Sequence, residues 1–249
     1  MTAIDGASLV VRGRRRRHCV AAGAAVVCVA LAAGACGPSR PAGPRGAPGT
    51  GAAPTAPTTT TTTVAPSTSV TVDPGALPQT PVRPVDNSAA VSALGAALWR
   101  AVVNDQPTAA MPFFFPLGAY QQLKALSDDA ADYQGRLVAH FDLDVAAAHA
   151  LLGTGAATAT LVGLVIPGSY VRWIPPGGCY NRLGYWFVPG SREVYREGGA
   201  VRSFGIAALD SWRGRWYIIH LGSEVPPAGQ GVVDAPAAGV GSFGSPSGC

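Results

Sequence analysis

Residues 201–221 read VRSFGIAALDSWRGRWYIIHL, and this stretch decides the fold. Two runs rich in aromatic and β-branched residues flank the dipeptide Arg213-Gly214, which is typical of a tight hairpin turn. The sequence therefore predicts that Val201–Trp212 and Arg215–Leu221 pair as antiparallel strands.

Upstream of this hairpin, the apolar period stays at two residues back to about residue 158, which indicates further strands. Turn-forming residues separate them, at Pro189-Gly190-Ser191 and at Glu197-Gly198-Gly199. The additional strands predicted are Thr158–Ile166, Tyr170–Ile174, Tyr180–Val188 and Glu193–Arg196.

Before residue 158 the pattern is helical. Asp86-Asn87-Ser88 offers capping oxygens, and apolar residues then recur at three- and four-residue spacing until Pro107. A second helix is predicted over Leu117–Leu126, and a third from Ser127-Asp128-Asp129 to a stop at Gly153. Helices followed by an antiparallel meander predict an α+β fold, with the N-terminal helices packed on a curved antiparallel sheet.

This order of elements resembles the nuclear transport factor 2-like fold, a cone-shaped superfamily that includes ketosteroid isomerases and many exported actinobacterial domains. The opening helix that ends at Asn104-Asp105-Gln106-Pro107 and the final aromatic hairpin carry the resemblance, which covers about residues 87–222. It implies a pocket inside the cone, but it carries no catalytic motif onto particular residues. The high content of Ala, Gly, Pro and Arg also suits an actinobacterial protein.

Composition divides the chain of 249 residues into four parts. All five tryptophans and all seven tyrosines lie within residues 87–222, which are long enough to form one core. Residues 37–86 are rich in Pro, Thr, Ala and Gly, a composition that predicts a disordered tether. Residues 223–249 form a Gly- and Pro-rich tail, and residues 1–36 read as a signal peptide.

The signal peptide has a basic segment over Arg12–Arg17, an apolar run over Cys19–Ala35, and then a polar change. Gly34-Ala35-Cys36 resembles the lipobox of bacterial lipoproteins, although Ala33 stands where that family usually has Leu. The resemblance implies that Cys36 is acylated, for example with palmitate, and anchors the chain to the outer face of the cytoplasmic membrane. Ordinary cleavage near Ala35 and a retained membrane helix are the alternatives.

The net charge of +4 belongs entirely to residues 1–35, and the rest of the chain holds 13 basic and 13 acidic residues. Without a basic field, the exported part offers nothing to hold a phosphate backbone, so no nucleic-acid partner is predicted. The partners expected are the membrane, through the lipid anchor, and components of the cell wall or envelope.

Cys179 and Cys249 are the thiols that remain after processing at Cys36, and an oxidising compartment favours a disulfide between them. The alternatives for Cys179 are an inert free thiol and a nucleophile. Gly178-Cys179 faintly resembles the exported cysteine transpeptidases, but the histidine that they carry just before the cysteine is absent here.

No motif for catalysis, for metal binding or for a cofactor stands out, so none of these sites is assigned. His140 and Asp144 are interpreted as a polar helix face, and Asp210 as a turn residue. Four residues are candidates to line a pocket in the cone: Trp173, Trp186, Trp216 and His220.

These observations favour a cell-envelope lipoprotein that presents a non-enzymatic binding or interaction domain. The alternative is a small exported enzyme of isomerase, dehydratase or hydrolase type with its site in the cone, and a purely structural envelope component is a third. Convergent polar groups with shifted pKa values would favour the enzyme, whereas a cone filled with apolar side chains would favour interaction.

Overall fold

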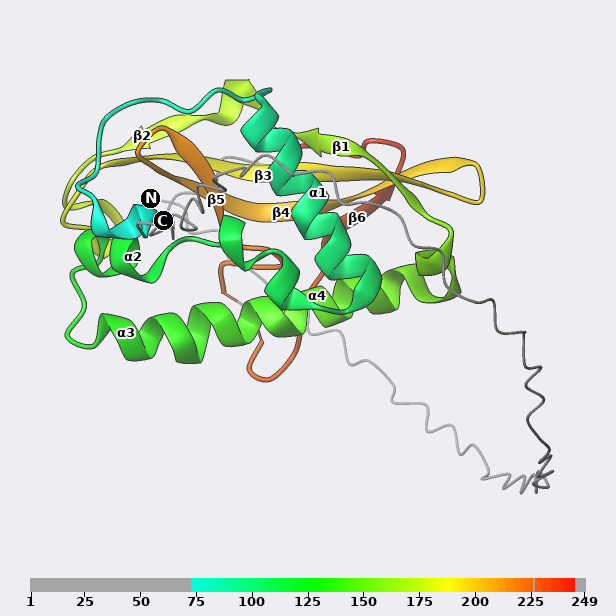
Figure 1. Cartoon of the computed structure of the whole chain (residues 1–249), viewed down its shortest axis with the longest axis horizontal. Coiled ribbons are helices and arrows are strands. Elements are labelled where there is room, and N and C mark those ends of the chain that lie inside the picture. The colour runs from blue at the N-terminus through cyan, green and yellow to red at the C-terminus, as the bar shows by residue number, and fades with distance from the viewer. Residues whose placement is uncertain (1–72, 226, 245–249) are drawn as a thin grey trace, which may run out of the picture. The chain divides into compact units, whose positions relative to one another are not determined.

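The computed structural model describes residues 73–225 and 227–244. Helices come first and a six-stranded antiparallel sheet follows, so the α+β class predicted from the sequence is present (Figure 1). The signal peptide with Cys36, the tether up to residue 72, and Cys249 lie outside the described residues.

The first helix begins and ends where the sequence indicates. α1 spans Ala89–Asn104, and Oγ of Ser88 accepts a hydrogen bond of 3.3 Å from the amide of Val91. Its predicted apolar face is buried, and the chain leaves the helix through Asp105 in the left-handed region. α1 contacts the first strand, β1, and its Trp99 ring lies 5.2 Å from the ring of Tyr195 on the sheet.

The third predicted helix is a continuous helical run with a change of geometry inside it. Asp128 caps α3 (Asp129–Asp132), a π-helical segment follows over Tyr133–Val138, and α4 spans Ala139–Leu152. A helix of this type places side chains at positions that a regular α-helix would not, and such segments are frequent at functional sites. The shorter α2, Leu117–Leu123, lies just before this run.

The sheet is built around two long strands, β3 (Tyr185–Glu197) and β4 (Ala200–Trp212). The strand order is β1-β3-β4-β5, with β2 beside the start of β3 and β6 beside the start of β4. The remaining strands are β1 (Thr160–Val165), β2 (Arg172–Ile174), β5 (Arg215–His220) and β6 (Asp234–Ala238). The β4–β5 hairpin confirms the pairing predicted across Arg213-Gly214.

The turn predicted at Pro189-Gly190-Ser191 is wrong. β3 runs without a break through these residues, since Pro189 pairs with Ala208 and Ser191 pairs with Ile206. Gly190 absorbs the irregularity with a φ of 59°, a conformation that glycine adopts without steric cost. The residues that resemble a turn therefore form a local distortion inside a long strand.

The domain begins earlier than residue 87. The indole nitrogens of Trp212 and Trp186 donate hydrogen bonds of 3.0 Å to the carbonyls of Pro74 and Pro81, and Nε2 of Gln79 donates to Ser211 at 3.0 Å. These long-range bonds fix residues 73–86 against the sheet. The part of the predicted tether that the structure describes is thus a packed strap of the domain.

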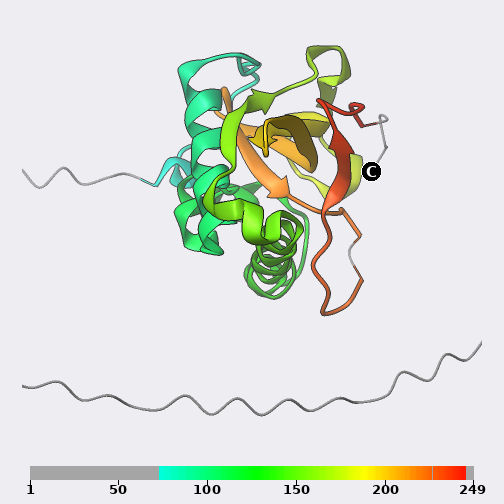
Figure 2. The ribbon, with the colours of Figure 1, turned by 90° about the vertical axis from the view of Figure 1, so that its right-hand side faces the viewer.

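The domain also extends beyond residue 222. Asp144 is buried on α4, and its carboxylate accepts hydrogen bonds from the amides of Gly222 (2.9 Å) and Val232 (2.7 Å). This anchors the segment that leads into β6, which lies on the side of the sheet away from α1 (Figure 2). The interpretation of Asp144 as part of a polar helix face is therefore wrong, because its partners are backbone groups of a distant segment.

Candidate functional site

A small pocket of about 90 Å³ is lined by several ionisable side chains. Helix α2, the π-helical segment, the loop around Cys179, and strands β3, β4 and β5 all contribute to its wall. Its polar lining residues are Tyr120, Lys124, Arg136, Tyr185, Asp210, His220 and Glu224.

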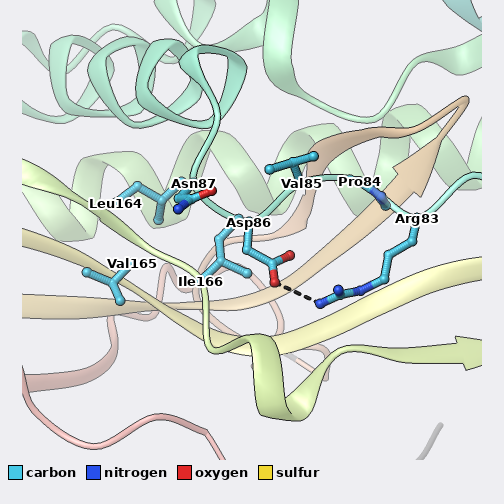
Figure 3. Close-up of a pocket in the computed structure, with 8 residues that line it drawn as sticks. All are labelled: Arg83, Pro84, Val85, Asp86, Asn87, Leu164, Val165 and Ile166. Carbon is cyan, nitrogen blue, oxygen red and sulfur yellow. Dashed lines mark hydrogen bonds and ion pairs between the residues drawn. The ribbon is translucent and has the colours of Figure 1, made fainter.

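A larger hollow of about 660 Å³ lies between Arg83–Asn87 and Leu164–Ile166 (Figure 3). Its two charged side chains, Arg83 and Asp86, form an ion pair of 2.7 Å with each other. The remaining lining is mainly apolar, and the hollow is open to solvent. It therefore offers less chemistry than the smaller pocket.

Asp210, on β4, lines the pocket. It is 4 % exposed, pairs with Phe187 on β3 and Tyr217 on β5, and its Oδ1 has no hydrogen-bond partner among the described residues. Burial raises the pKa of Asp210 to about 7, while the positive charge of Lys124 acts in the opposite direction. Asp210 can therefore both accept and donate a proton near neutral pH.

The sequence interpretation of Asp210 as a turn residue is wrong, because β4 continues for two residues beyond it. Two-residue alternation along β4 puts Asp210 on the same side as Ala208, and both line the pocket. Asp210 is therefore a candidate functional residue, because buried ionisable groups in pockets often take part in function.

His220 lies where the sequence predicts a pocket residue, at the end of β5. Burial lowers the pKa of His220 to about 3, and the positive charges of Arg136 and Lys124 lower it further. The imidazole is therefore neutral at physiological pH and acts as a hydrogen-bonding group rather than as a cation.

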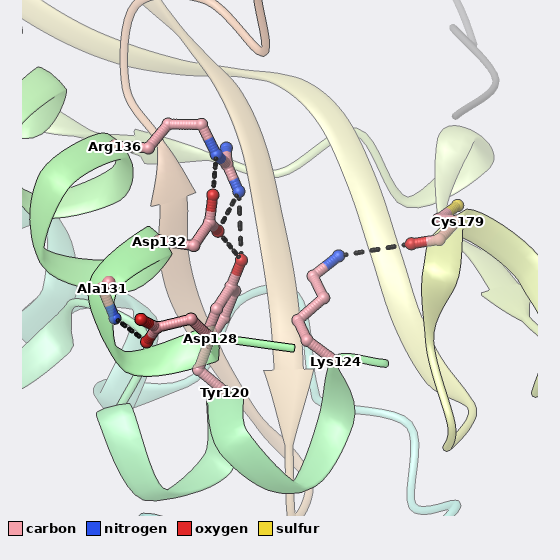
Figure 4. Close-up of polar contacts among 7 residues, drawn as sticks. All are labelled: Tyr120, Lys124, Asp128, Ala131, Asp132, Arg136 and Cys179. Atoms are coloured by element: carbon pink, nitrogen blue, oxygen red, sulfur yellow. Dashed lines mark hydrogen bonds and ion pairs between the residues drawn. The ribbon is translucent and has the colours of Figure 1, made fainter. Parts of the chain in front are cut away.

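Lys124, at the end of α2, brings a cation to the pocket. Its Nζ donates a long hydrogen bond of 3.5 Å to the carbonyl of Cys179, and it lies 5.9 Å from the centre of the Tyr120 ring (Figure 4). Burial lowers the pKa of Lys124, and the nearby carboxyl of Asp210 opposes that shift.

Arg136 is bonded to Asp132 and Tyr120, and this group lies on the side of Lys124 away from Cys179 (Figure 4). Its guanidinium donates to both oxygens of Asp132, at 2.8 and 2.7 Å, and to Oη of Tyr120 at 3.0 Å. The Tyr120 hydroxyl also donates to Asp132. The hydrogen bonds from Arg136 lower the pKa of Asp132, and burial raises the pKa of Tyr120. The π-helical segment that carries Arg136 is thus tied to α2.

Tyr185, two residues before Phe187 on β3, completes the polar wall. Its Oη accepts a hydrogen bond of 3.3 Å from Nδ2 of the buried Asn181. Burial raises the pKa of Tyr185, and the carboxyl of Asp210 adds to this effect. The hydroxyl therefore stays protonated and can donate toward an oxygen in the pocket.

The three tryptophans predicted to line a pocket do not border this one. Trp173 and Trp186 form an edge-to-face pair at 5.4 Å, and Trp186 is bonded to the strap at Pro81. Since side chains alternate along a strand, Trp186 faces away from the pocket when Tyr185 and Phe187 face into it. Trp216 is buried beside a separate cavity of about 20 Å³.

Cys179 lies at the rim of the pocket in a turn with a φ of 55°. It is disulfide-bonded, which leaves no thiol on Cys179 to act as a nucleophile. Its predicted partner, Cys249, lies outside the described residues, so the pairing of these two cysteines stays a prediction.

Within residues 73–225 and 227–244, no group of three or more His, Cys, Asp or Glu residues is placed to hold a metal ion. In the same residues, no helix has both the length and the hydropathy to cross a bilayer.

Searches with this chain against protein-family models, curated proteins and solved structures found no match.

Proposed function

We propose that the domain is a small acid–base enzyme that moves a proton at carbon, as an isomerase or a dehydratase does. The observation that supports this best is Asp210, a buried carboxyl with a pKa of about 7 in the lining of a polar pocket. Keeping such a group unpaired costs stability, and proteins accept this cost most often at sites that use the group.

The neighbouring side chains suit distinct roles in this chemistry. Asp210 takes the proton from the substrate carbon and returns it elsewhere, since its pKa allows both steps at neutral pH. The hydroxyl of Tyr185 and the neutral imidazole of His220 donate hydrogen bonds to the oxygen on which negative charge develops. Helix α2, the π-helical segment and strands β3, β4 and β5 supply the wall of the pocket, which limits access of water.

Hydrogen–deuterium exchange at carbon tests this proposal without knowledge of the natural substrate. We expect the full chain in D₂O to speed deuterium incorporation into at least one of pyruvate, 2-oxobutyrate, acetone and butanone, measured by proton NMR. The same change should be absent with Asp210→Asn, because the base is removed. Equal rates for the two proteins across the panel would contradict the enzyme proposal.

A non-enzymatic binding domain is the second candidate, and the small size of the pocket favours it. A volume of about 90 Å³ is well below the several hundred Å³ typical of sites for larger ligands. The exchange experiment separates the two candidates, since a binding domain would take up a small molecule without exchanging its protons.

We further propose that the domain has the cone of the nuclear transport factor 2-like fold, and that it is exported and anchored at the cell envelope. The order of helices before a meander supports the first point, and a pocket between helices and sheet is consistent with it. The second point rests on the sequence of residues 1–36.

Lipidation at Cys36 has a direct test. Labelling of growing cells with a clickable palmitate analogue should tag the wild-type protein, whereas Cys36→Ser should carry no label, because the acceptor thiol is lost. Cys28→Ser, inside the apolar run, is the matched control and should label normally. Equal labelling of the wild type and Cys36→Ser would refute the lipoprotein proposal.

A further inference from the structure

The pocket contains the one lysine of the chain. Every other basic residue among the 18 Lys and Arg residues is arginine. Arginine keeps its charge in any environment and prefers two-pronged partners, whereas lysine presents a compact charge that binds a single oxygen well. The appearance of lysine here, in a chain that otherwise uses arginine, singles out position 124.

The ammonium of Lys124 forms no ion pair in the described part of the chain. Its one hydrogen bond runs to a backbone carbonyl at 3.5 Å, and none of the ion pairs includes it. Asp132 is already occupied by Arg136 and Tyr120. Asp210 faces the same pocket but lies beyond ion-pair distance of Lys124. A partly buried cation of this kind leaves a place for an anion.

Other donors surround the same space. Nη1 of Arg136 has no partner among the described residues, although Nε and Nη2 are bonded. His220 and Tyr185 also border the pocket. An oxyanion beside Lys124 would thus find further hydrogen-bond donors close by.

The size and the charge of the pocket restrict the anion. With a volume of about 90 Å³, the pocket has room only for a small molecule. Asp210 and Glu224 also line the pocket, and their carboxyls would repel a second negative charge. A small monoanion fits these conditions better than phosphate or a dicarboxylate.

We propose that the pocket binds a short-chain monocarboxylic acid as its anion, with the carboxylate against Lys124 and the adjoining carbons toward Asp210. The part played by Asp210 rests on the proposed function, whereas the binding of the carboxylate to Lys124 does not. This assignment makes Lys124 the residue that determines which class of ligand enters.

The single lysine allows a direct experiment on the full chain. With ¹³C-labelled lysine, the protein gives one Cε signal, whose shift with pH reports the pKa of Lys124. Propionate should raise this pKa by about one unit, as a nearby opposite charge does, whereas propionamide should leave it unchanged. Arg196→Lys, exposed on β3, adds a reference signal that neither compound should move.

Three outcomes would overturn the inference. These are no response to propionate, an equal response to propionamide, and a response to inorganic phosphate as large as that to propionate. A fourth measurement uses Lys124→Met, in which propionate should no longer raise the melting temperature. If this variant does not fold, Lys124→Gln serves the same purpose, and the titration of the wild type decides in any case.

The outcome for the proposed function is separate. If deuterium exchange depends on Asp210 but the Lys124 signal does not respond to propionate, the enzyme proposal stands and the carboxylate-binding proposal fails. If the Lys124 signal responds to propionate but no deuterium exchange occurs, the domain binds a carboxylate and the enzyme proposal fails.

Discussion

Replacing Asp210 with asparagine is expected to stabilise the folded domain above neutral pH while abolishing proton transfer. The carboxyl is buried, and its pKa is raised from 3.8 to about 7. Because the native state holds this proton more tightly than the unfolded chain, stability falls as pH rises from about 4 to about 7 and then stays low. A shift of this size corresponds to roughly 4 kcal/mol, so we expect a gain of about 2 to 4 kcal/mol in Asp210→Asn at pH 8.

Urea unfolding followed by tryptophan fluorescence at pH 4.5, 6 and 8 measures this effect. The wild type should lose stability across the series, and Asp210→Asn should lose less of it. Asp105→Asn is the matched control, since Asp105 is exposed and its left-handed backbone accepts asparagine. If Asp210→Asn is destabilised and keeps the pH profile of the wild type, Asp210 has a structural role instead.

Glu193→Met is expected to give the second large gain in stability. Glu193 lies on β3 between Phe204 and Leu164, and it is completely buried beneath α1, where a Cβ on Gly95 would lie 3.4 Å from its Oε2. Neither carboxyl oxygen has a hydrogen-bond partner among the described residues, and burial raises the pKa well above its usual value.

The native state therefore keeps Glu193 protonated at a pH where the unfolded chain has lost that proton. Stability falls as pH rises above the usual range of glutamate, and methionine, of similar length, removes this loss. We expect a gain of about 1 to 4 kcal/mol at pH 8, measured by urea unfolding. Glu193→Gln should remove the pH dependence but gain less, because its amide stays buried without partners. An unchanged pH profile in Glu193→Met would contradict this account.

Local patterns in the sequence predicted those parts of the fold that local interactions determine. Ser88 caps α1 through a bond to a residue three positions away, and Arg213-Gly214 joins two adjacent strands. The strap at residues 73–86 could not be predicted in this way. Its bonds reach residues more than 100 positions away, and its proline-rich composition matches that of the chain before it.

The candidate site was only partly predictable for the same reason. His220 lines the pocket although strict alternation would group it with Trp216 and Ile218, because the β4–β5 register shifts at Ile219. Lys124 and Asp210 line the same pocket although they are far apart in the sequence, and no sequence spacing predicts that they share it. The signal that could have identified Lys124 is its position as the one lysine in an arginine-rich chain.

The pKa of Asp210 tests the central claim most directly. In the full chain with ¹³C-labelled aspartate, the side-chain carboxyl signal that disappears in Asp210→Asn belongs to Asp210, and its shift can be followed from pH 3 to pH 9. We predict a midpoint near pH 7, as burial in the pocket requires. A midpoint near pH 4, the ordinary value for an exposed aspartate, would contradict the acid–base site.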